Sequence, residues 1–361
     1  MKTRKHINYK LVILMILSIF SIAFVYNDYF LYKTSILKIN NIENVYEEDS
    51  EFYTQKITGV IKNGKYKDNI ITYENKSSYS GVYDEQIHDK SELLLELDST
   101  GKEVIRFVGI KRDKYLVVLI ILFINLLLIV TRFKGLKTLF TLFINILISI
   151  FSVLLFNQYR TNMNMLLLYI FVSLIFIILS LYIPNGKSKK TLAAILSSII
   201  SLFVSFSFSV ILIKLFGSDL SIWNMEYMEI VYDYKNFFYV NILLCGLGAI
   251  MDIAITISSS LNELIVKNPR ISKSSLLKSG KEISKDIIGT MSNVMLYTCF
   301  TPIIPTIFLA MRNGVILSRA FSLYGILDLV IVLCSAISIV LSIPISLYVS
   351  VLILKGKGGV K

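Results

Sequence analysis

The chain is poor in the residues that build most metal and catalytic centres. Its 361 residues include only 2 histidines and 3 cysteines. His6 and His88 lie far apart in the sequence, and Cys245, Cys299 and Cys334 all fall inside long apolar segments. Distant histidines and cysteines without CxxC spacing predict neither a zinc site nor a disulfide framework. We therefore expect no metal and no cofactor, and the sequence does not favour an enzyme.

Charged residues are also scarce, at 17% of the chain against ~25% in an average soluble domain. Hydrophobic residues make up 55%, and several apolar runs exceed the ~18 residues that indicate a membrane-spanning helix. The net charge is +12, but the lysines and arginines cluster beside these runs. That pattern is typical of cytoplasmic loops rather than of a nucleic-acid-binding face. The sequence predicts a multi-pass membrane protein whose main partner is the lipid bilayer, with no nucleic acid.

The first apolar run, residues 11–26, follows several basic residues. We interpret residues 1–31 as an uncleaved transmembrane helix; a cleaved signal peptide is the alternative, because Ser21-Ile22-Ala23 has a weak cleavage-like pattern. Basic clusters fall in alternate gaps between the later spans, so both termini are expected in the cytoplasm. Arg312 and Arg319 are the exception. The seven later spans are expected at about 115–131, 137–156, 164–183, 191–216, 237–260, 287–310 and 323–353.

One polar block, residues 32–114, is large enough to form a domain. Short alternating segments predict strands, and Asn63-Gly64 and Ser99-Thr-Gly101-Lys are turn signals. A small β-barrel or sandwich outside the cytoplasm is expected, either as a binding domain or as a folded spacer. The fold class is thus an all-α polytopic membrane protein of about eight transmembrane helices, seven of them in 115–361, with a small mainly-β extracytoplasmic domain. The expected strands are 55–61, 69–73, 93–97 and 104–108.

Two expected helices carry polar side chains at steps of three and four residues, which places these side chains on one helix face. Lipid cannot satisfy polar groups, so the two polar faces are expected to line one cavity or a wet path. A purely structural seam is the alternative, because interhelical hydrogen bonds are worth ~0.6 kcal/mol each. The first face carries Cys245, Gly248, Asp252, Thr256, Ser259 and Glu263, and the second carries Asp286, Thr290, Asn293, Tyr297 and Thr301.

Asp252 is the strongest candidate for a functional residue. A charge at the middle of a membrane costs about 2.5–3.5 kcal/mol, so an aspartate there is rarely idle. Asp286 has a second interpretation, as a favourable charge at a helix N-terminus. Gly246, Gly248 and Gly289 would permit close packing of helices.

The segments around these residues resemble the YibE/F family of bacterial membrane proteins. Gly246–Ala254 and Ser258–Leu264 are similar to the hallmark of that family, and Lys285–Asn293 is similar to its second block. Lys285 stands where the family usually has arginine, and Tyr297–Phe300 replaces a stretch richer in small residues. The resemblance implies a bacterial plasma-membrane protein of the longer, YibE-like kind. It supports the architecture and the location rather than a mechanism.

Three functions are compatible with these patterns. The leading hypothesis is a permease or exporter of a small solute or peptide, in which Asp252 responds to an ion or to substrate, with Asp286, Asn293 and Ser259 as further lining residues. A non-catalytic scaffold or sensor with an outer binding domain is the alternative. An intramembrane aspartyl hydrolase using Asp252 with Asp286 or Asp328 is less favoured, because no familiar protease motif surrounds them. A second family member or a homo-oligomer is the expected partner.

Overall fold

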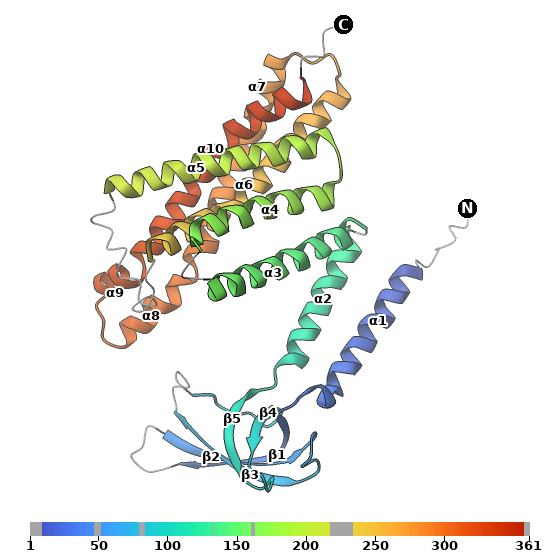
Figure 1. Ribbon diagram of the computed structural model, residues 1–361, viewed down its shortest axis with the longest axis vertical. Helices are drawn as coiled ribbons and strands as arrows, with labels where there is room; N and C mark the ends of the chain where they lie inside the picture. Colours follow the sequence, from blue (N-terminus) through green and yellow to red (C-terminus); the bar gives the residue numbers. More distant parts are fainter. Residues whose placement is uncertain are drawn as a thin grey trace. The chain divides into compact units, whose positions relative to one another are not determined.

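The computed structural model describes residues 9–46, 52–78, 84–131, 133–159, 163–216 and 234–356. The chain divides into two compact units, residues 1–132 and 133–361 (Figure 1). The first unit combines two helices with a β-sheet, and the second unit is helical throughout its described residues.

The helices of the first unit flank the sheet in sequence and pair with each other in space (Figure 1). Helix α1 (Tyr9–Tyr26) leads into the short 3-10 helix η1 (Asp28–Leu31), and α2 (Asp113–Thr131) follows the last strand. The Asn125 amide donates a hydrogen bond of 3.0 Å to the Ser18 hydroxyl between α1 and α2. Two apolar helices thus leave the sheet side by side.

Five antiparallel strands form a near-barrel with the order β3-β2-β1-β4-β5. Its core is apolar: Leu37, Ile57 and Leu93 are fully buried. We call this part of the chain, residues 28–112, the β domain. The strands are β1 (Ser35–Tyr46), β2 (Phe52–Ile61), β3 (Ile70–Ser78), β4 (Glu92–Leu97) and β5 (Val104–Ile110).

The expected small β domain is confirmed, with one strand more than the sequence predicted. Strand β1 was missed because a bulge between Ile39 and Asn41 interrupts its alternation of apolar and polar residues. Both expected turns are present. Gly64 and Gly101 have φ values of +74° and +71°, a conformation in which glycine pays no steric cost.

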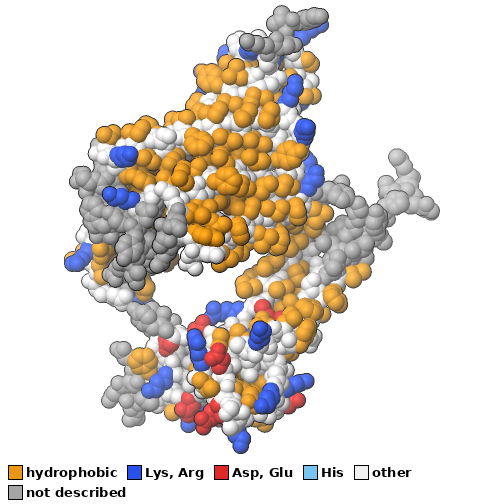
Figure 2. Space-filling view, in the orientation of Figure 1, with side chains coloured by type: hydrophobic (Ala, Val, Ile, Leu, Met, Phe, Trp, Pro, Cys, Tyr) orange, Lys and Arg blue, Asp and Glu red, His pale blue; other side chains and the backbone are white. Residues whose placement is uncertain are grey.

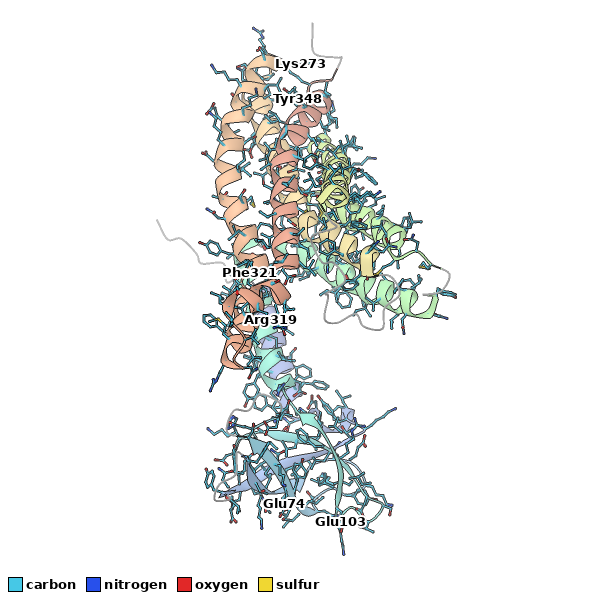
Figure 3. The ribbon with its side chains drawn as sticks, turned by 90° about the vertical axis from the view of Figure 1, so that its left-hand side faces the viewer. Glu74, Glu103, Lys273, Arg319, Phe321 and Tyr348 are labelled. Atoms are coloured by element: carbon cyan, nitrogen blue, oxygen red, sulfur yellow. The ribbon has the colours of Figure 1, made fainter. Side chains whose placement is uncertain are left out.

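Helix α10 is the centre of the helical unit, because it packs against α5, α6 and α7. Figure 3 labels Lys273 at the start of α7 near Tyr348 of α10, with Arg319 and Phe321 at the opposite end of the bundle. The helices are α3 (Phe133–Tyr159), α4 (Met165–Asn185), α5 (Lys189–Phe216), α6 (Tyr234–Lys267), α7 (Lys273–Phe300), α8 (Ile303–Arg312), α9 (Leu317–Tyr324) and α10 (Ile326–Leu354).

Among the described residues, seven helical segments are long and apolar enough to cross a membrane. They are α2, α3, α4, α5, α6, the pair α7–α8 and α10. Helix α1 has 18 described residues and is not among them, so the count of eight spans stays a prediction. The space-filling view agrees with this class: hydrophobic side chains cover most of the visible face of the helical unit, whereas acidic and basic side chains mix on the β domain (Figure 2).

The sixth expected span, 287–310, differs from the observed helices at both ends. Helix α7 already begins at Lys273, because the Ser272 hydroxyl caps it by accepting a hydrogen bond from the Ser275 N–H at 3.1 Å. It ends at Phe300, before Pro302, which has no N–H to continue the helical ladder. The short helix α8 follows.

The expected span 323–353 is likewise divided. Helix α9 ends at Tyr324 and α10 begins at Ile326, with Gly325 between them. Asp328 lies exposed in the first turn of α10, where a negative charge is favourable.

Candidate functional site

The polar face predicted on α6 is present and lies on the surface of the helical unit. Gly248, Asp252, Thr256 and Glu263 are exposed, and Ser259 is half-buried. The opposite face of the helix is apolar and packs on α10: Ile253, Ile257 and Leu261 are fully or almost fully buried. The three-four spacing therefore separates the two faces as expected, but the polar face looks away from the bundle.

Helix α7 repeats this arrangement. Asp286, Gly289, Thr290 and Asn293 are exposed, whereas apolar neighbours such as Met291 pack against α6 and α10. The Thr290 hydroxyl donates to the backbone oxygens of Asp286 and Ile287, at 3.2 and 3.1 Å, so the helix itself satisfies it.

The polar faces of α6 and α7 lie at the same depth along the two helices. Helices α6 and α7 are antiparallel neighbours joined by residues 268–272 (Figure 3). A Cβ built on Gly280 would lie 3.2 Å from Leu261, which fixes the register between the two helices. Asp252 is as many residues from Leu261 as Gly289 is from Gly280. Because both helices rise 1.5 Å per residue, Asp252 and Gly289 lie at the same depth. Asn293 lies about 6 Å beyond that level.

Asp252 lies near the middle of α6, and within the part of the chain that the structure describes it forms no hydrogen bond or ion pair. Lys285 on α7 is paired instead with Glu282, at 2.9 Å. The expected enclosure of Asp252 is thus not provided by these two helices alone. The roles of Asp252 and its polar neighbours stay predictions.

The glycines of the site differ in what they contact. A Cβ on Gly246 would lie 3.3 Å from the Ser338 Cβ, so this glycine lets α6 approach α10 closely. A Cβ on Gly248 or Gly289 would meet nothing within 4 Å. Close packing at these two glycines stays a prediction, and it would require a contact from outside the described residues. Gly280, which contacts the Leu347 and Leu261 side chains, is a packing position that the pattern analysis did not single out.

Helices α5 and α10, which pack against each other, carry a seam of buried serines that was not predicted from the sequence. These side chains are 0–4% exposed, and small residues at such positions let helices approach closely. Several hydroxyls donate to their own helix, as Ser335 does to the Ile331 oxygen at 2.8 Å. The signal was present, because serine recurs every three or four residues in 335–350. The seam comprises Ser197, Ser198, Ser201, Ser205 and Ser209 of α5 and Ser335, Ser338, Ser342, Ser346 and Ser350 of α10.

A second polar cluster fastens the β domain to its two helices. The Lys111 ammonium, which is buried, lies 2.6 Å from an Asp28 carboxylate oxygen and 2.8 Å from one of Asp113. The Tyr32 hydroxyl donates to Asp113 at 2.6 Å. Asp28 follows α1 and Asp113 opens α2, so one lysine at the end of β5 joins both helices. We call Asp28, Lys111, Asp113 and Tyr32 the lysine clamp.

The lysine clamp perturbs the acid–base equilibria of its members. Burial raises the pKa of Asp28, the Asp113 carboxylate raises it further, and Lys111 opposes both effects. Burial also lowers the pKa of Lys111, but hydrogen bonds and attraction to Asp113 and Asp28 outweigh it, so the net pKa of Lys111 is raised. Burial and the hydrogen bond to Asp113 raise the pKa of Tyr32.

The helices and the β domain together define the class of the protein. It is a multi-pass membrane protein with seven apolar helices of spanning length and an N-terminal antiparallel near-barrel. The model of the YibE/F-like proteins matches residues 119–356, and that of the YibE/F family N-terminal domain matches residues 30–111. The chain belongs to the YibE/F family, as the sequence resemblance indicated. Comparisons with curated proteins and with solved structures give no match.

Proposed function

We propose that this YibE/F protein is a subunit of a permease for a small solute or peptide, with the polar face of α6 and α7 lining the path. One observation carries the proposal: Asp252 lies near the middle of a span and is exposed, with polar residues of α7 at the same depth. Asp252 is the carboxylate that responds to an ion or to substrate. Asp286, Asn293 and Ser259 are further lining residues.

A polar face of this kind needs water or protein beside it. A charge exposed to lipid at the middle of a span costs about 2.5–3.5 kcal/mol, and the other polar groups add to that cost. Gly248 and Gly289, which face open space, allow the backbone of another subunit to approach closely. A second copy of this chain, or another family member, is the partner that would complete the path.

Cysteine accessibility tests the path directly. In a background with the native cysteines replaced, Thr256→Cys, Ser259→Cys and Thr290→Cys should react with a small water-soluble thiol reagent in membrane vesicles. Ile257→Cys and Ile288→Cys, on the packed faces, should not react. Leu333→Cys is the matched lipid-facing control, because Leu333 is 53% exposed on α10 among apolar neighbours. Reaction of Thr256→Cys no faster than that of Leu333→Cys would refute a wet path.

A disulfide experiment distinguishes the possible partners. Under mild oxidation, Gly248→Cys should cross-link to a second copy if the partner is the same chain. Labelling at Thr256→Cys without any cross-link at Gly248→Cys would point to a different family member. Asp252→Asn should leave expression and folding unchanged, because its carboxylate has no partner among the described residues.

A sensor is the second candidate, and the lysine clamp favours it. A buried ion pair between β5, the segment after α1 and the start of α2 would transmit a change in the β domain to both helices. Deletion of the β domain should then abolish function while the α6–α7 variants are tolerated. The permease hypothesis predicts the opposite: the α6–α7 variants should abolish function, and deletion of the β domain should be less harmful.

A further inference from the structure

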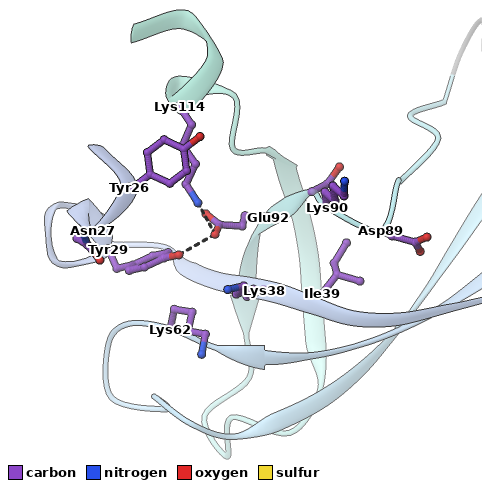
Figure 4. A pocket seen from close by; sticks show the side chains of 11 residues that line it. Tyr26, Asn27, Tyr29, Lys38, Ile39, Lys62, Asp89, Lys90, Glu92 and Lys114 are labelled. Carbon is purple, nitrogen blue, oxygen red and sulfur yellow. Dashed lines mark hydrogen bonds and ion pairs between the residues drawn. The ribbon is translucent and has the colours of Figure 1, made fainter. Parts of the chain in front are cut away.

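A cavity of about 560 Å³ lies where the β domain meets its two helices (Figure 4). Its size falls in the range of ~300–1,000 Å³ usual for small-molecule sites. Tyr26 and Tyr29 come from the end of α1 and from η1, Lys38 from β1, Glu92 from β4 and Lys114 from the first turn of α2. The site is therefore built from segments that the fold brings together from across the β domain.

The cavity is rich in uncompensated positive charge. Lys38, Lys62 and Lys90 line it, and none of these three lysines forms an ion pair with a described residue. Lys114 is the fourth lysine, but it pairs with Glu92 at 2.5 Å. Asp89 is the other acidic residue in the lining. Four ammonium groups against two carboxylates favour an anionic ligand.

The wall of the cavity also contains a buried acceptor that has no partner among the described residues. Glu92 is 6% exposed, and its Oε1 accepts hydrogen bonds from Lys114 and, at 2.7 Å, from the Tyr29 hydroxyl (Figure 4). The other oxygen, Oε2, is buried and accepts no hydrogen bond from any described residue. A buried acceptor without a partner costs ~1–3 kcal/mol. Glu92 lines the cavity, so a ligand that displaces Lys114 or Tyr29 from the carboxylate could donate to it in their place.

We infer that this cavity binds a phosphate group that carries a neighbouring hydroxyl or ammonium group. The phosphate oxygens accept from Lys38 and Lys62, which lie near each other in Figure 4, because an ammonium group is a strong donor to phosphate. The hydroxyl or ammonium group donates to the Glu92 carboxylate. Phospholipid headgroups and soluble phosphorylated polyols share this chemistry. The inference is independent of whether the helical unit transports a solute.

The surroundings of the cavity favour a lipid as the source. Lys114 lies in the first turn of α2, which is a candidate span. Next to the cavity the chain exposes three large apolar or aromatic side chains: Tyr26 at 51%, Phe30 at 71% and Leu31 at 59%. Aromatic and apolar residues beside a candidate span such as α2 are typical of the headgroup level of a bilayer.

Two binding measurements on the full-length protein separate the sources. Native mass spectrometry would count lipids retained after release from nanodiscs of phosphatidylglycerol or of phosphatidylcholine. Titration calorimetry in detergent would measure binding of sn-glycerol 3-phosphate. Retention of phosphatidylglycerol without heat from glycerol phosphate identifies a lipid site, and binding of glycerol phosphate identifies a soluble ligand. Absence of both signals in the unmodified protein would overturn the inference.

Charge variants of opposite sign make the test specific. Lys38→Gln and Lys62→Gln should each weaken binding about ten-fold or more, because a hydrogen bond from a charged donor is lost. Asp89→Asn should strengthen binding, since it removes a negative charge from the lining. Lys102→Gln is the matched control, because Lys102 is exposed in the same domain and lies outside the cavity. Equal affinities for the lining variants and for Lys102→Gln would also overturn the inference. Lys38→Arg, which keeps the charge, separates loss of binding from loss of folding.

Discussion

At the scale of single residues, loss of the Lys111 side chain should strongly destabilise the β domain, because its ammonium group pairs with two carboxylates. Lys111→Met would leave the Asp28 and Asp113 carboxylates in contact without their cation, and breaking a buried ion pair typically costs about 3–5 kcal/mol. We expect hydrogen exchange in β1 and β4 to accelerate strongly in the full-length protein. Lys102→Met, at an exposed position of the same domain, should leave exchange unchanged. Similar exchange in both variants would contradict a structural role for the lysine clamp.

The pH dependence of the β domain follows from two half-buried, hydrogen-bonded tyrosines, Tyr29 and Tyr32. Burial and hydrogen bonds to Glu92 and Asp113 raise the pKa values of Tyr29 and Tyr32 above 10.0. Folding favours the protonated phenols, so their contribution to stability is complete below pH 10 and is lost as the pH rises through the folded-state values. The raised pKa of Lys111 acts in the same direction.

Alkaline titration followed by tyrosinate absorbance measures this effect. These two phenols should ionise only together with unfolding of the β domain. In the Tyr29→Phe, Tyr32→Phe variant that late step should lose two phenols, leaving Tyr73, whose pKa burial also raises, and stability at neutral pH should fall because two hydrogen bonds are lost. Ionisation of the same number of phenols before unfolding in both proteins would argue against buried donors.

At the scale of helices, two glycines of α6 provide a matched pair. Gly246→Val would push α6 away from Ser338 of α10, and overpacking of this kind costs typically 1–3 kcal/mol. Gly248→Val should not lower the thermal stability of the isolated chain, because no atom lies within 4 Å of its Cβ position. Thermal unfolding in detergent measures both effects. A larger loss for Gly248→Val than for Gly246→Val in monomeric protein would contradict the packing described here.

The helical elements could be predicted from the sequence more closely than the sheet. Long apolar runs define spans because composition alone limits what a bilayer accepts. The ends of the helices were harder to predict, because the Ser272 cap and the Pro302 break depend on a few backbone groups. Strand β1 was hidden by its bulge, since its apolar residues do not alternate regularly.

The sequence predicted which residues of the candidate site share a helix face, but not whether that face is buried or exposed. Steps of three and four residues correctly grouped Asp252 with Thr256 and Glu263 on one face of α6. Which face turns outward depends on the partners of α6, and the sequence does not state that α10 takes the isoleucine face. The polar face of α6 was expected to lie inside the bundle. The polar side chains that the bundle buries are instead the serines of α5 and α10.

At the scale of the whole molecule, the distribution of basic residues predicts the membrane topology. The basic segment between α6 and α7 should be cytoplasmic and the β domain should lie on the other side. A cysteine reporter for the β domain needs an exposed position: Ser77 is fully buried in β3, whereas Lys102 is exposed. Asn224, in the gap between α5 and α6 that the sequence predicts on the same side as the β domain, lies outside the described residues. Lys102→Cys should react with an impermeant thiol reagent in intact cells. Ser274→Cys should react only after permeabilisation, and its labelling from outside would reverse the topology.

Figure 3 shows Glu74 and Glu103 at the end of the β domain away from α1 and α2. A soluble partner of the β domain would find this end without the membrane in its way. The cavity lined by Lys38, Lys62 and Lys90 lies at the opposite end of the β domain, where the chain enters α2.

The lysine clamp also sets an order for synthesis. Asp28 and its partner Lys111 are 83 residues apart, and Lys111 follows the last strand of the sheet. At ~5–20 residues per second, a ribosome needs roughly 4 to 17 s to make the intervening chain. During that interval α1 has already been made, but the sheet lacks β5 and Asp28 has no cation. Because β5 ends at Ile110 and α2 begins at Asp113, the near-barrel can close only as α2 begins to emerge, so completion of the β domain coincides with the appearance of that helix.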